Sequence, residues 1–341
     1  MAAAEEGALV LVDGSSIAFR CAAGEAILDA ALAAGVALPH QCRGASCGTC
    51  KVELLEGEVD HGWALGFAIT DEEKAAGRCL ACQAMPRSPR LRIRPLAPMP
   101  DEDGGVREIA ATVLVARAET PRVRRLVLAP VPGTALDARP GQSVELVLPG
   151  VEPNRCYSVV HDPREDGLVE LWVARHPGGA ASGQVHDRLR AGDTVGLRGP
   201  FGSFGVPAGA GEVVALAGGT GLAPILSVLA TELQAGLADD VLLLLSVREH
   251  DEILGLERLE RLARRHPNLR YEVACTDGPS PLARHRDLLP AVLPNCVPTL
   301  RGARVMVAGS PGFVAACVEA ARALGARPEA IAVDTFTPAA G

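Results

Sequence analysis

The sequence has no apolar run that approaches the roughly 20 residues of a membrane-spanning helix. It also has no excess of basic residues. With 33 Lys and Arg against 41 Asp and Glu, the net charge is −8, which argues against nucleic acid or an anionic membrane as the main partner. The stretch from Met1 to Gly7 lacks the basic and apolar regions of a signal peptide, so we expect a cytoplasmic protein.

The eight histidines form no pair with the spacing of metal ligands, whereas the ten cysteines need an explanation. In a reducing compartment structural disulfides are rare, so clustered cysteines indicate a metal or redox role. Half of them lie between Cys42 and Cys82. For the scattered remainder we expect buried, small apolar side chains; these are Cys21, Cys156, Cys275, Cys296 and Cys317.

The clustered cysteines have the spacing of a plant-type [2Fe–2S] ferredoxin. Cys42, Cys47 and Cys50 follow a C-x4-C-x2-C pattern, and a fourth cysteine lies about thirty residues further on. The fourth ligand is either Cys79 or Cys82. A structural zinc site is the alternative, but such sites usually use two C-x2-C pairs, and only one half of that pattern is present here.

Three segments differ in pattern, and we expect domains at residues 1–98, 104–207 and 208–341. The first predicts strands over Ala8–Val12, Ser16–Arg20 and Leu91–Arg94, and a helix over Glu25–Ala34. The Pro-rich stretch from Pro95 to Asp103 indicates a short linker.

The second segment consists of β-branched runs interrupted by Gly and Pro, which is typical of an antiparallel barrel. We expect its strands over Ala111–Val115, Val123–Leu128, Ser143–Leu148, Tyr157–Val160, Val169–Ala174 and Thr194–Leu197.

The third segment alternates strand and helix, which predicts a doubly wound parallel sheet with its ligand at the carboxyl ends of the strands. We expect strands over Val213–Ala217, Val241–Ser246, Tyr271–Cys275, Val305–Ala308 and Ala330–Val333, and helices over Ile225–Gln234, Leu256–Arg265 and Phe313–Leu324.

The tetrapeptide Arg155-Cys-Tyr157-Ser158 resembles the Arg-x-Tyr-Ser motif of the ferredoxin–NADP reductase superfamily. The resemblance implies that Arg155 pairs with the FAD pyrophosphate, that Tyr157 packs on the isoalloxazine ring and that Ser158 hydrogen-bonds near N5. A guanidinium fork, an aromatic face and a small hydroxyl suit these tasks.

Further motifs in the same order are similar to those of the superfamily. Val173-Ala-Arg175 followed by Gly179-Ala180-Ala-Ser182 implies a strand and then a short helix whose N-terminus binds the flavin pyrophosphate. The turn Gly199-Pro-Phe-Gly202 closes the barrel in the family. Gly219-Thr220-Gly221-Leu-Ala-Pro224, between a strand and a helix, implies the NAD(P) loop.

Gly309-Ser-Pro311 stands at the position of the family's Cys-Gly-x-Pro motif, but Ala308 replaces the cysteine. That cysteine usually lies near the reacting nicotinamide, so hydride transfer here has a different neighbour. Phe336 resembles the terminal aromatic residue that covers the flavin. The adenosine ribose is expected after the second strand of the third segment. There Asp251 or Glu252 would accept a hydrogen bond from its 2′-hydroxyl, whereas Ser246 and Arg248 would instead suit a 2′-phosphate.

With the resemblance extended to the ferredoxin segment, a β-grasp fold is implied and the fourth ligand is Cys82, which has the family's Cys-x-Ala-x-Pro context. Cys79 is then a neighbour. The order of the three domains is similar to that of oxygenase reductase components, such as those of benzoate dioxygenase, methane monooxygenase and aryl O-demethylating cytochrome P450 systems.

The resemblance implies an enzyme that passes electrons from NADH through FAD and the cluster to an oxygenase or cytochrome P450 partner. NADPH is possible as the electron donor, and we expect a monomer. Tyr157, Ser158 and Phe336 would act at the flavin. Two alternatives stay open: a reductase that feeds a deoxysugar dehydratase intermediate, and a non-catalytic redox carrier or sensor, which Ala308 alone favours.

Overall fold

The structure is a computed structural model that describes residues 7–40, 44–45, 47–64, 66, 68–97, 99, 106–151 and 154–336. The chain forms two compact units, residues 1–106 with 201–203 and residues 107–200 with 204–341, and each is described by itself. No helix in these described ranges combines the length and apolarity needed to cross a bilayer. The predicted linker lies largely outside the described residues.

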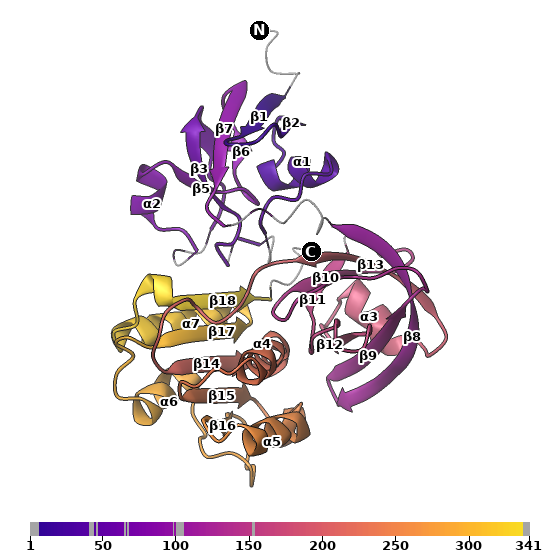
Figure 1. The fold of residues 1–341 in the computed structure, drawn as a ribbon, viewed down its shortest axis with the longest axis vertical. Coiled ribbons are helices and arrows are strands. Elements are labelled where there is room, and N and C mark those ends of the chain that lie inside the picture. Colours follow the sequence, from indigo (N-terminus) through magenta and orange to yellow (C-terminus); the bar gives the residue numbers. More distant parts are fainter. Residues whose placement is uncertain are drawn as a thin grey trace. The chain divides into compact units, whose positions relative to one another are not determined.

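The N-terminal unit is built on a five-stranded sheet of order β2-β1-β7-β3-β5, with a small two-stranded sheet of β4 and β6 (Figure 1). Its core packs apolar side chains of the sheet against α1, with Ile27, Leu28 and Leu91 fully buried. The elements are β1 (Ala8–Val12), β2 (Ala18–Cys21), α1 (Ile27–Ala33), β3 (Lys51–Glu56), β4 (Val59–Asp60), α2 (Asp71–Ala75), β5 (Arg78–Leu80), β6 (Met85–Pro86) and β7 (Arg90–Pro95).

The loop between β1 and β2 is longer than the expected strand bounds implied, since the second strand begins at Ala18 and not at Ser16. Ser15 donates its hydroxyl to the Val12 carbonyl, and the Ile17 carbonyl accepts from the Val12 N–H. These bonds delay the second strand to Ala18. The short helix α2 was not predicted, although Thr70 and Glu73 form a capping box whose pattern the sequence contains.

The second segment forms the predicted antiparallel barrel, a six-stranded sheet of order β11-β10-β13-β8-β9-β12. The bridge between Val159 and Leu171 joins its first and last strands, so the sheet closes. Two bulges let the long strands β8 and β9 coil. The elements are β8 (Arg107–Thr120), β9 (Val123–Pro130), β10 (Ser143–Val147), β11 (Arg155–Ser158), β12 (Val169–Ala174), α3 (Ala180–Asp187) and β13 (Thr194–Phe201).

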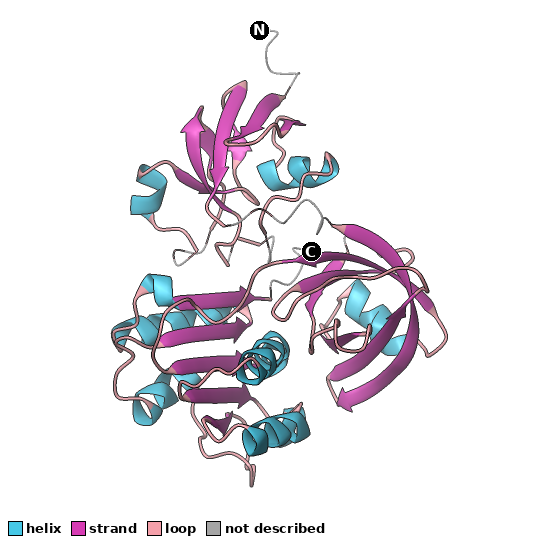
Figure 2. Cartoon of the chain, in the orientation of Figure 1, coloured by secondary structure: helices cyan, strands magenta, loops and turns pink. Residues whose placement is uncertain are grey.

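The third segment forms the predicted doubly wound parallel sheet, of order β16-β15-β14-β17-β18. Helices α4 and α5 lie on one face and α6 and α7 on the other (Figure 2), and the strands are therefore almost continuously apolar. Chain order reverses between β14 and β17, which is where such sheets bind ligands.

The elements of this sheet and its connections begin with β14 (Val213–Gly218), η2 (Gly219–Gly221), α4 (Leu222–Gln234), β15 (Val241–Val247), η3 (His250–Glu252), α5 (Leu256–Arg265) and β16 (Leu269–Cys275). They continue with α6 (Leu289–Cys296), β17 (Arg304–Gly309), α7 (Pro311–Ala323), η4 (Pro328–Ala330) and β18 (Ile331–Thr335). Helix α6 was not predicted because Pro290 and Pro294 interrupt its sequence pattern.

The scattered cysteines are only partly as expected. Cys21, Cys275 and Cys317 are buried, but Cys156 and Cys296 are half-buried.

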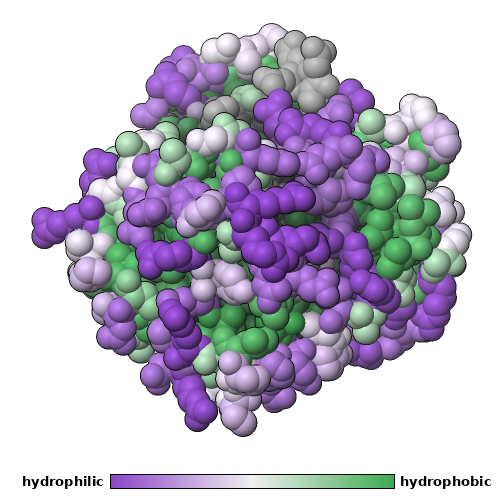
Figure 3. Space-filling model, turned by 60° about the horizontal axis from the view of Figure 1, so that its bottom comes forward, coloured by the Kyte–Doolittle hydropathy of each residue, from purple (hydrophilic) through white to green (hydrophobic). Residues whose placement is uncertain are grey.

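On the face shown in Figure 3, hydrophilic side chains cover most of the surface and hydrophobic ones gather in smaller patches, as in an ordinary water-exposed surface.

A buried carboxylate joins the barrel to the parallel-sheet domain. Glu170 on β12 accepts two hydrogen bonds from Arg125, at 2.9 and 3.0 Å, and two from Arg258 on α5, at 2.8 and 2.6 Å. The Arg258 guanidinium also lies 5.8 Å from the Trp172 ring centroid. Burial raises the pKa of Glu170, but the hydrogen bonds from Arg125 and Arg258 outweigh it and hold that pKa below its ordinary value.

Replacing Glu170 with Gln is therefore expected to destabilise this unit. The cost is about 2–3 kcal/mol, less than for a fully buried pair because the two arginines keep about a quarter of their side chains exposed. Because the pKa is lowered on folding, this stabilisation is present above the ordinary glutamate pKa of about 4.3 and is lost as the pH falls through the lower folded value.

Urea unfolding followed by circular dichroism measures the effect at pH 7. Glu260→Gln is the matched control, since its partner Arg264 is 3.7 Å away and 67% exposed, and it should change the free energy of unfolding by less than about 0.5 kcal/mol. Equal effects of the two changes would contradict the prediction.

Candidate functional site

Three of the predicted cluster ligands have thiols that lie close together in the N-terminal unit. Cys47 is half-buried, while Cys50 and Cys82 are buried. A hydrogen bond to Cys82, burial, and the thiols of Cys82 and Cys47 raise the pKa of Cys50 well above its ordinary value. Thiols this close suit a bound cation, whose charge offsets the repulsion between thiolates. Cys42 lies outside the described residues.

Cys79 has a different environment from Cys82. It is fully buried on β5, where it pairs with Val52 of β3, and burial followed by the charge at Cys82 raises its pKa to about 12. The Cys82 thiol, by contrast, hydrogen-bonds to Cys50. This arrangement supports Cys82 as the fourth member of the ligand set.

The predicted flavin residues lie on β11, which pairs with β10 in the barrel. Arg155 and Tyr157 are half-buried and Ser158 is buried. Burial raises the pKa of Tyr157 to about 12, so its phenol stays neutral and apolar in character at physiological pH. A neutral, partly covered aromatic face suits a planar ring.

The Ser158 hydroxyl has a partner that the sequence did not indicate. It lies 3.0 Å from Oδ2 of Asp334 on β18, and Asp334 is buried. A serine has a single hydroxyl proton. When that proton is donated to Asp334, the same hydroxyl can only accept a hydrogen bond from any further group.

The predicted pyrophosphate helix α3 begins at Ala180, with Gly179 as its N-cap and no side-chain hydrogen bond at the cap. Ser182 does not cap the helix; its hydroxyl accepts from the His176 N–H and so shapes the preceding turn. Arg175 forms two hydrogen bonds to Asp187 at the end of α3, at 2.7 and 2.9 Å.

Val173 is fully buried in the barrel core, and its carbonyl lies 2.9 Å from Nε2 of His186 on α3. This contact and the pair of Arg175 with Asp187 hold β12 and α3 together. The uncapped helix start that follows offers N–H groups to an anion, which is the fit expected for a pyrophosphate.

The predicted nucleotide loop lies at the switch point of the parallel sheet. Residues 219–221 form a 3₁₀ turn directly after β14 and before α4. Gly219 has a φ of +52° and open space where a Cβ would stand, which leaves room for close approach of a ligand. A Cβ on Gly221 would clash with the Ala308 carbonyl oxygen, so this loop packs tightly on the end of β17. Pro224 is buried in the first turn of α4.

Gly309 and Pro311 lie beside this loop, at the end of β17 and the start of α7. The Phe313 ring covers both Gly218 and Gly309, since a Cβ on either would come within 3.0 Å of it. The half-buried Phe336 donates its N–H to the Gly309 carbonyl at 2.9 Å. The structure thus brings the terminal aromatic residue to the predicted nicotinamide end of the loop, next to Ala308.

At the predicted ribose position, Arg248 and Asp251 are exposed. Arg248 pairs with Glu252 at 3.2 Å, and Arg122 of the barrel lies 3.6 Å from the same carboxylate. Glu252 is therefore already paired with two arginines, whereas the exposed Asp251 is the more accessible of the two carboxylates for a ribose hydroxyl.

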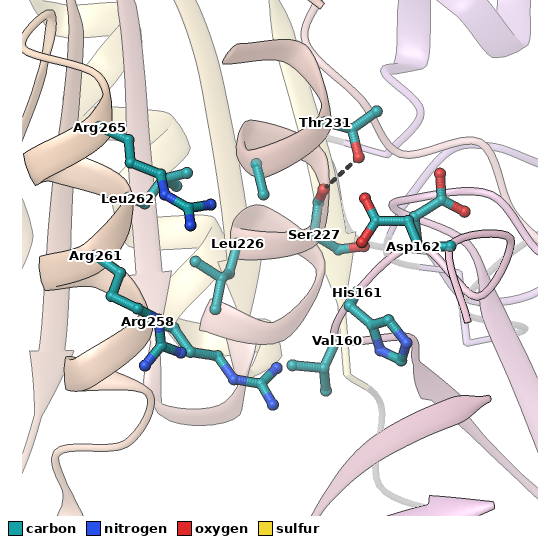
Figure 4. Close-up of a pocket in the computed structure, with 12 residues that line it drawn as sticks. Val160, His161, Asp162, Leu226, Ser227, Thr231, Arg258, Arg261, Leu262 and Arg265 are labelled. Carbon is teal, nitrogen blue, oxygen red and sulfur yellow. Dashed lines mark hydrogen bonds between the residues drawn. The ribbon is translucent and has the colours of Figure 1, made fainter. Parts of the chain in front are cut away.

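A cavity of about 170 Å³ lies between the barrel segment around His161 and helices α4 and α5 (Figure 4). Arg258, Arg261 and Arg265 line it from α5, and Ser227 and Thr231 from α4. Its lining includes none of the residues predicted to bind FAD or NAD(P). Sequence patterns gave no signal for it, because its lining comes from three elements that are distant in the sequence.

Comparison with known proteins identifies all three segments. Residues 10–87 match the 2Fe-2S iron-sulfur cluster binding domain, 112–205 the oxidoreductase FAD-binding domain and 215–319 the oxidoreductase NAD-binding domain. The reductase subunit of an aromatic O-demethylase from an Amycolatopsis species is 37% identical over 94% of this chain and 96% of its own.

Other relatives serve different oxygenases. The reductase component of the naphthalene 1,2-dioxygenase system of Pseudomonas putida is 31% identical over 93% of this chain and 94% of its own. The crystal structure of the Amycolatopsis cytochrome P450 reductase GcoB has 36% identity and a TM-score of 0.79, covering 97% of this chain and 99% of that one.

These matches confirm the expected cofactors, a [2Fe–2S] cluster, FAD and NAD(P), and the predicted classes of the three folds. The chain therefore belongs to the iron–sulfur flavoprotein reductase components of oxygenase systems, within the ferredoxin–NADP reductase superfamily, and is an NAD(P)H-dependent oxidoreductase.

Proposed function

We propose that this chain is the reductase component of a cytochrome P450 system, which it supplies with electrons from NADH. The aromatic O-demethylase reductase subunit and the P450 reductase GcoB each match it over nearly their whole length. That coverage, with all three domains in the same order, is the observation that carries the proposal. A Rieske dioxygenase or a diiron monooxygenase is the second candidate acceptor, since the reductase components of a phenol 2-monooxygenase and of a naphthalene 1,2-dioxygenase system are also similar.

In this proposal the domains span residues 1–98, 104–207 and 208–341, and each binds one cofactor. Bound FAD would accept a hydride from NADH and release electrons singly to the cluster. Cys42, Cys47, Cys50 and Cys82 would hold the cluster. Because the chain carries all three sites itself, it would act as a monomer.

The chain's own residues position the ligands. The N–H groups at the start of α3 would hold the flavin pyrophosphate, Arg155 would pair with it, and Tyr157 would cover the ring. Residues 219–221 and 309–311 would hold the nicotinamide dinucleotide between β14 and β17. Phe336 would occupy the place of the nicotinamide until NADH enters. Asp334 would fix the orientation of the Ser158 hydroxyl.

The test is reconstitution with purified acceptors. The holoprotein, which should be red-brown from FAD and cluster, is expected to reduce a P450 faster than a Rieske or diiron oxygenase when each is supplied with its substrate. A faster rate with a Rieske or diiron oxygenase would move the proposal to that acceptor. Failure to oxidise NADH even with ferricyanide would instead favour a carrier or sensor.

We expect a preference for NADH over NADPH of at least about tenfold in kcat/KM, equivalent to about 1.4 kcal/mol. Asp251, in its open position at the predicted ribose site, would accept a hydrogen bond from the 2′-hydroxyl and repel a 2′-phosphate. Asp251→Asn should narrow the preference, and Glu257→Gln, an exposed change on α5, should not. A wild-type preference for NADPH would overturn this assignment.

A further inference from the structure

Outside the cofactor sites, three potential metal ligands of different chemistry converge on the edge of the parallel sheet. They are Glu272 on β16, His285 in the loop that returns along this strand, and Cys296 at the end of α6. Their ligand atoms lie within 4.8 Å of one another, and all three residues are half-buried. Neither the family match nor the proposed electron transfer uses them.

The distances between these atoms can be compared with the edges of a zinc tetrahedron. Bond lengths of about 2.3 Å to sulfur, 2.05 Å to nitrogen and 2.0 Å to oxygen give edges of about 3.6 Å for S···N, 3.5 Å for S···O and 3.3 Å for N···O. In the structure Cys296 Sγ lies 3.6 Å from His285 Nε2 and 3.8 Å from Glu272 Oε2.

The third edge is shorter, because His285 Nε2 and Glu272 Oε2 share a hydrogen bond of 2.6 Å. An ion between them would replace this hydrogen bond and increase the distance between the two atoms by about 0.7 Å. Such a shift is within reach of small side-chain rotations. The two sulfur distances already lie within about 0.3 Å of those that the ion requires.

The surroundings fix each ligand in place. The backbone of His285 bridges Ala274, and its carbonyl accepts from the Cys275 N–H at 3.0 Å, so the histidine is fastened to the edge strand. Arg284 donates to the other carboxylate oxygen of Glu272 at 2.8 Å, which leaves Oε2 directed at His285 and Cys296. In known metal sites, hydrogen-bond partners of this kind, which do not contact the metal themselves, hold the ligand side chains in the correct orientation.

We propose that Glu272, His285 and Cys296 form a zinc site that ties β16, the returning loop and α6 together. Thiolate, imidazole and carboxylate are a donor set that suits Zn²⁺, and Cys296 would release its proton to solvent on binding. Among the described residues the group has these three members, so water would take the fourth position.

Zinc binding would also affect the end of the parallel-sheet domain where the nucleotide is predicted to bind. The returning loop carries Ser280, whose hydroxyl lies 2.9 Å from His250 Nδ1, and the Asp277 N–H donates to the Arg248 carbonyl. A bound ion that holds this loop to β16 would therefore make the turn after β15 more rigid.

The experiment uses the full-length holoprotein, freed of adventitious metal with a chelator and titrated with ZnCl₂ against a fluorescent zinc indicator. We expect one zinc per chain beyond the unchanged iron content. Cys296→Ser and His285→Gln should each weaken binding at least about tenfold, the lower end of what loss of even an outer-shell partner costs. Cys317→Ala is the matched control, since that thiol is buried in α7 and does not belong to the group.

Two further measurements do not depend on the folding of a variant. Zinc K-edge X-ray absorption should show one sulfur at about 2.3 Å with nitrogen and oxygen neighbours. Zinc should also slow alkylation of Cys296 at least about tenfold, while the half-buried Cys156 reacts as before. No uptake at about 10 µM zinc, a shell without sulfur, or equal affinity of wild type and Cys296→Ser would each overturn the proposal.

Discussion

Replacing Cys82 with Ser is expected to remove the [2Fe–2S] cluster, whereas replacing Cys79 with Ala should leave it in place. The Cys82 thiol hydrogen-bonds to Cys50, next to Cys47, and serine oxygen is a poor substitute for a thiolate toward iron. Cys79 is fully buried between strands and contributes packing only. Iron content, visible absorption and the paramagnetic resonance of the reduced protein measure the outcome.

Alanine is preferred over serine at position 79, because a hydroxyl buried there without a partner would cost about 1–3 kcal/mol and obscure the comparison. FAD content serves as the internal control, since the flavin residues are in the other unit. Loss of iron from the Cys79 variant with retention in the Cys82 variant would reverse the assignment of the fourth ligand.

Replacing Cys47 with Ser should separate two activities of the enzyme. NADH oxidation with ferricyanide is expected to remain within about twofold of wild type, because this small reagent can take electrons directly from the flavin. Electron transfer to a P450 or to cytochrome c should fall at least about 100-fold. The variant lacks the cluster, which is tethered to the flavin domain and passes electrons from the flavin to a protein acceptor.

The variant is first shown to lack iron and to keep its FAD. Cys21→Ala is the matched control, because that thiol is buried in the same unit and directed at the Glu25 carbonyl, not at the cluster loop. Near wild-type transfer to the protein acceptor by a cluster-free variant would show that the flavin itself faces the partner.

Much of the fold could be predicted from local patterns. Strand β12 and helix α5 have the predicted bounds because their apolar periodicity is uninterrupted. Helix α6 was missed because its two prolines break the pattern, although tertiary packing against α7 supports it. Helix α2 was missed although its capping box was visible, since it buries no residue and has no apolar face to recognise.

The site could be predicted where motifs are contiguous and not where they are assembled by the fold. The cysteine loop and the glycine turn are local, and the family match covers both. The partner of Ser158 and the carboxylate of Glu170 between two arginines join residues 45 to 176 positions apart. The group at Cys296 spans only 24 positions, but its members lie on a strand, a loop and a helix and follow no ligand spacing. No spacing rule finds such pairs, because strand order decides which residues meet.

The hydrogen bond between Ser158 and Asp334 spans 176 positions of the chain. During synthesis the barrel strand that carries Ser158 leaves the ribosome long before β18 is made, and domains generally fold in the order of their emergence. The barrel can therefore be complete while its serine still lacks this partner. The contact forms only when β18 adds to the edge of the parallel sheet, so it is made later than the contacts within the barrel.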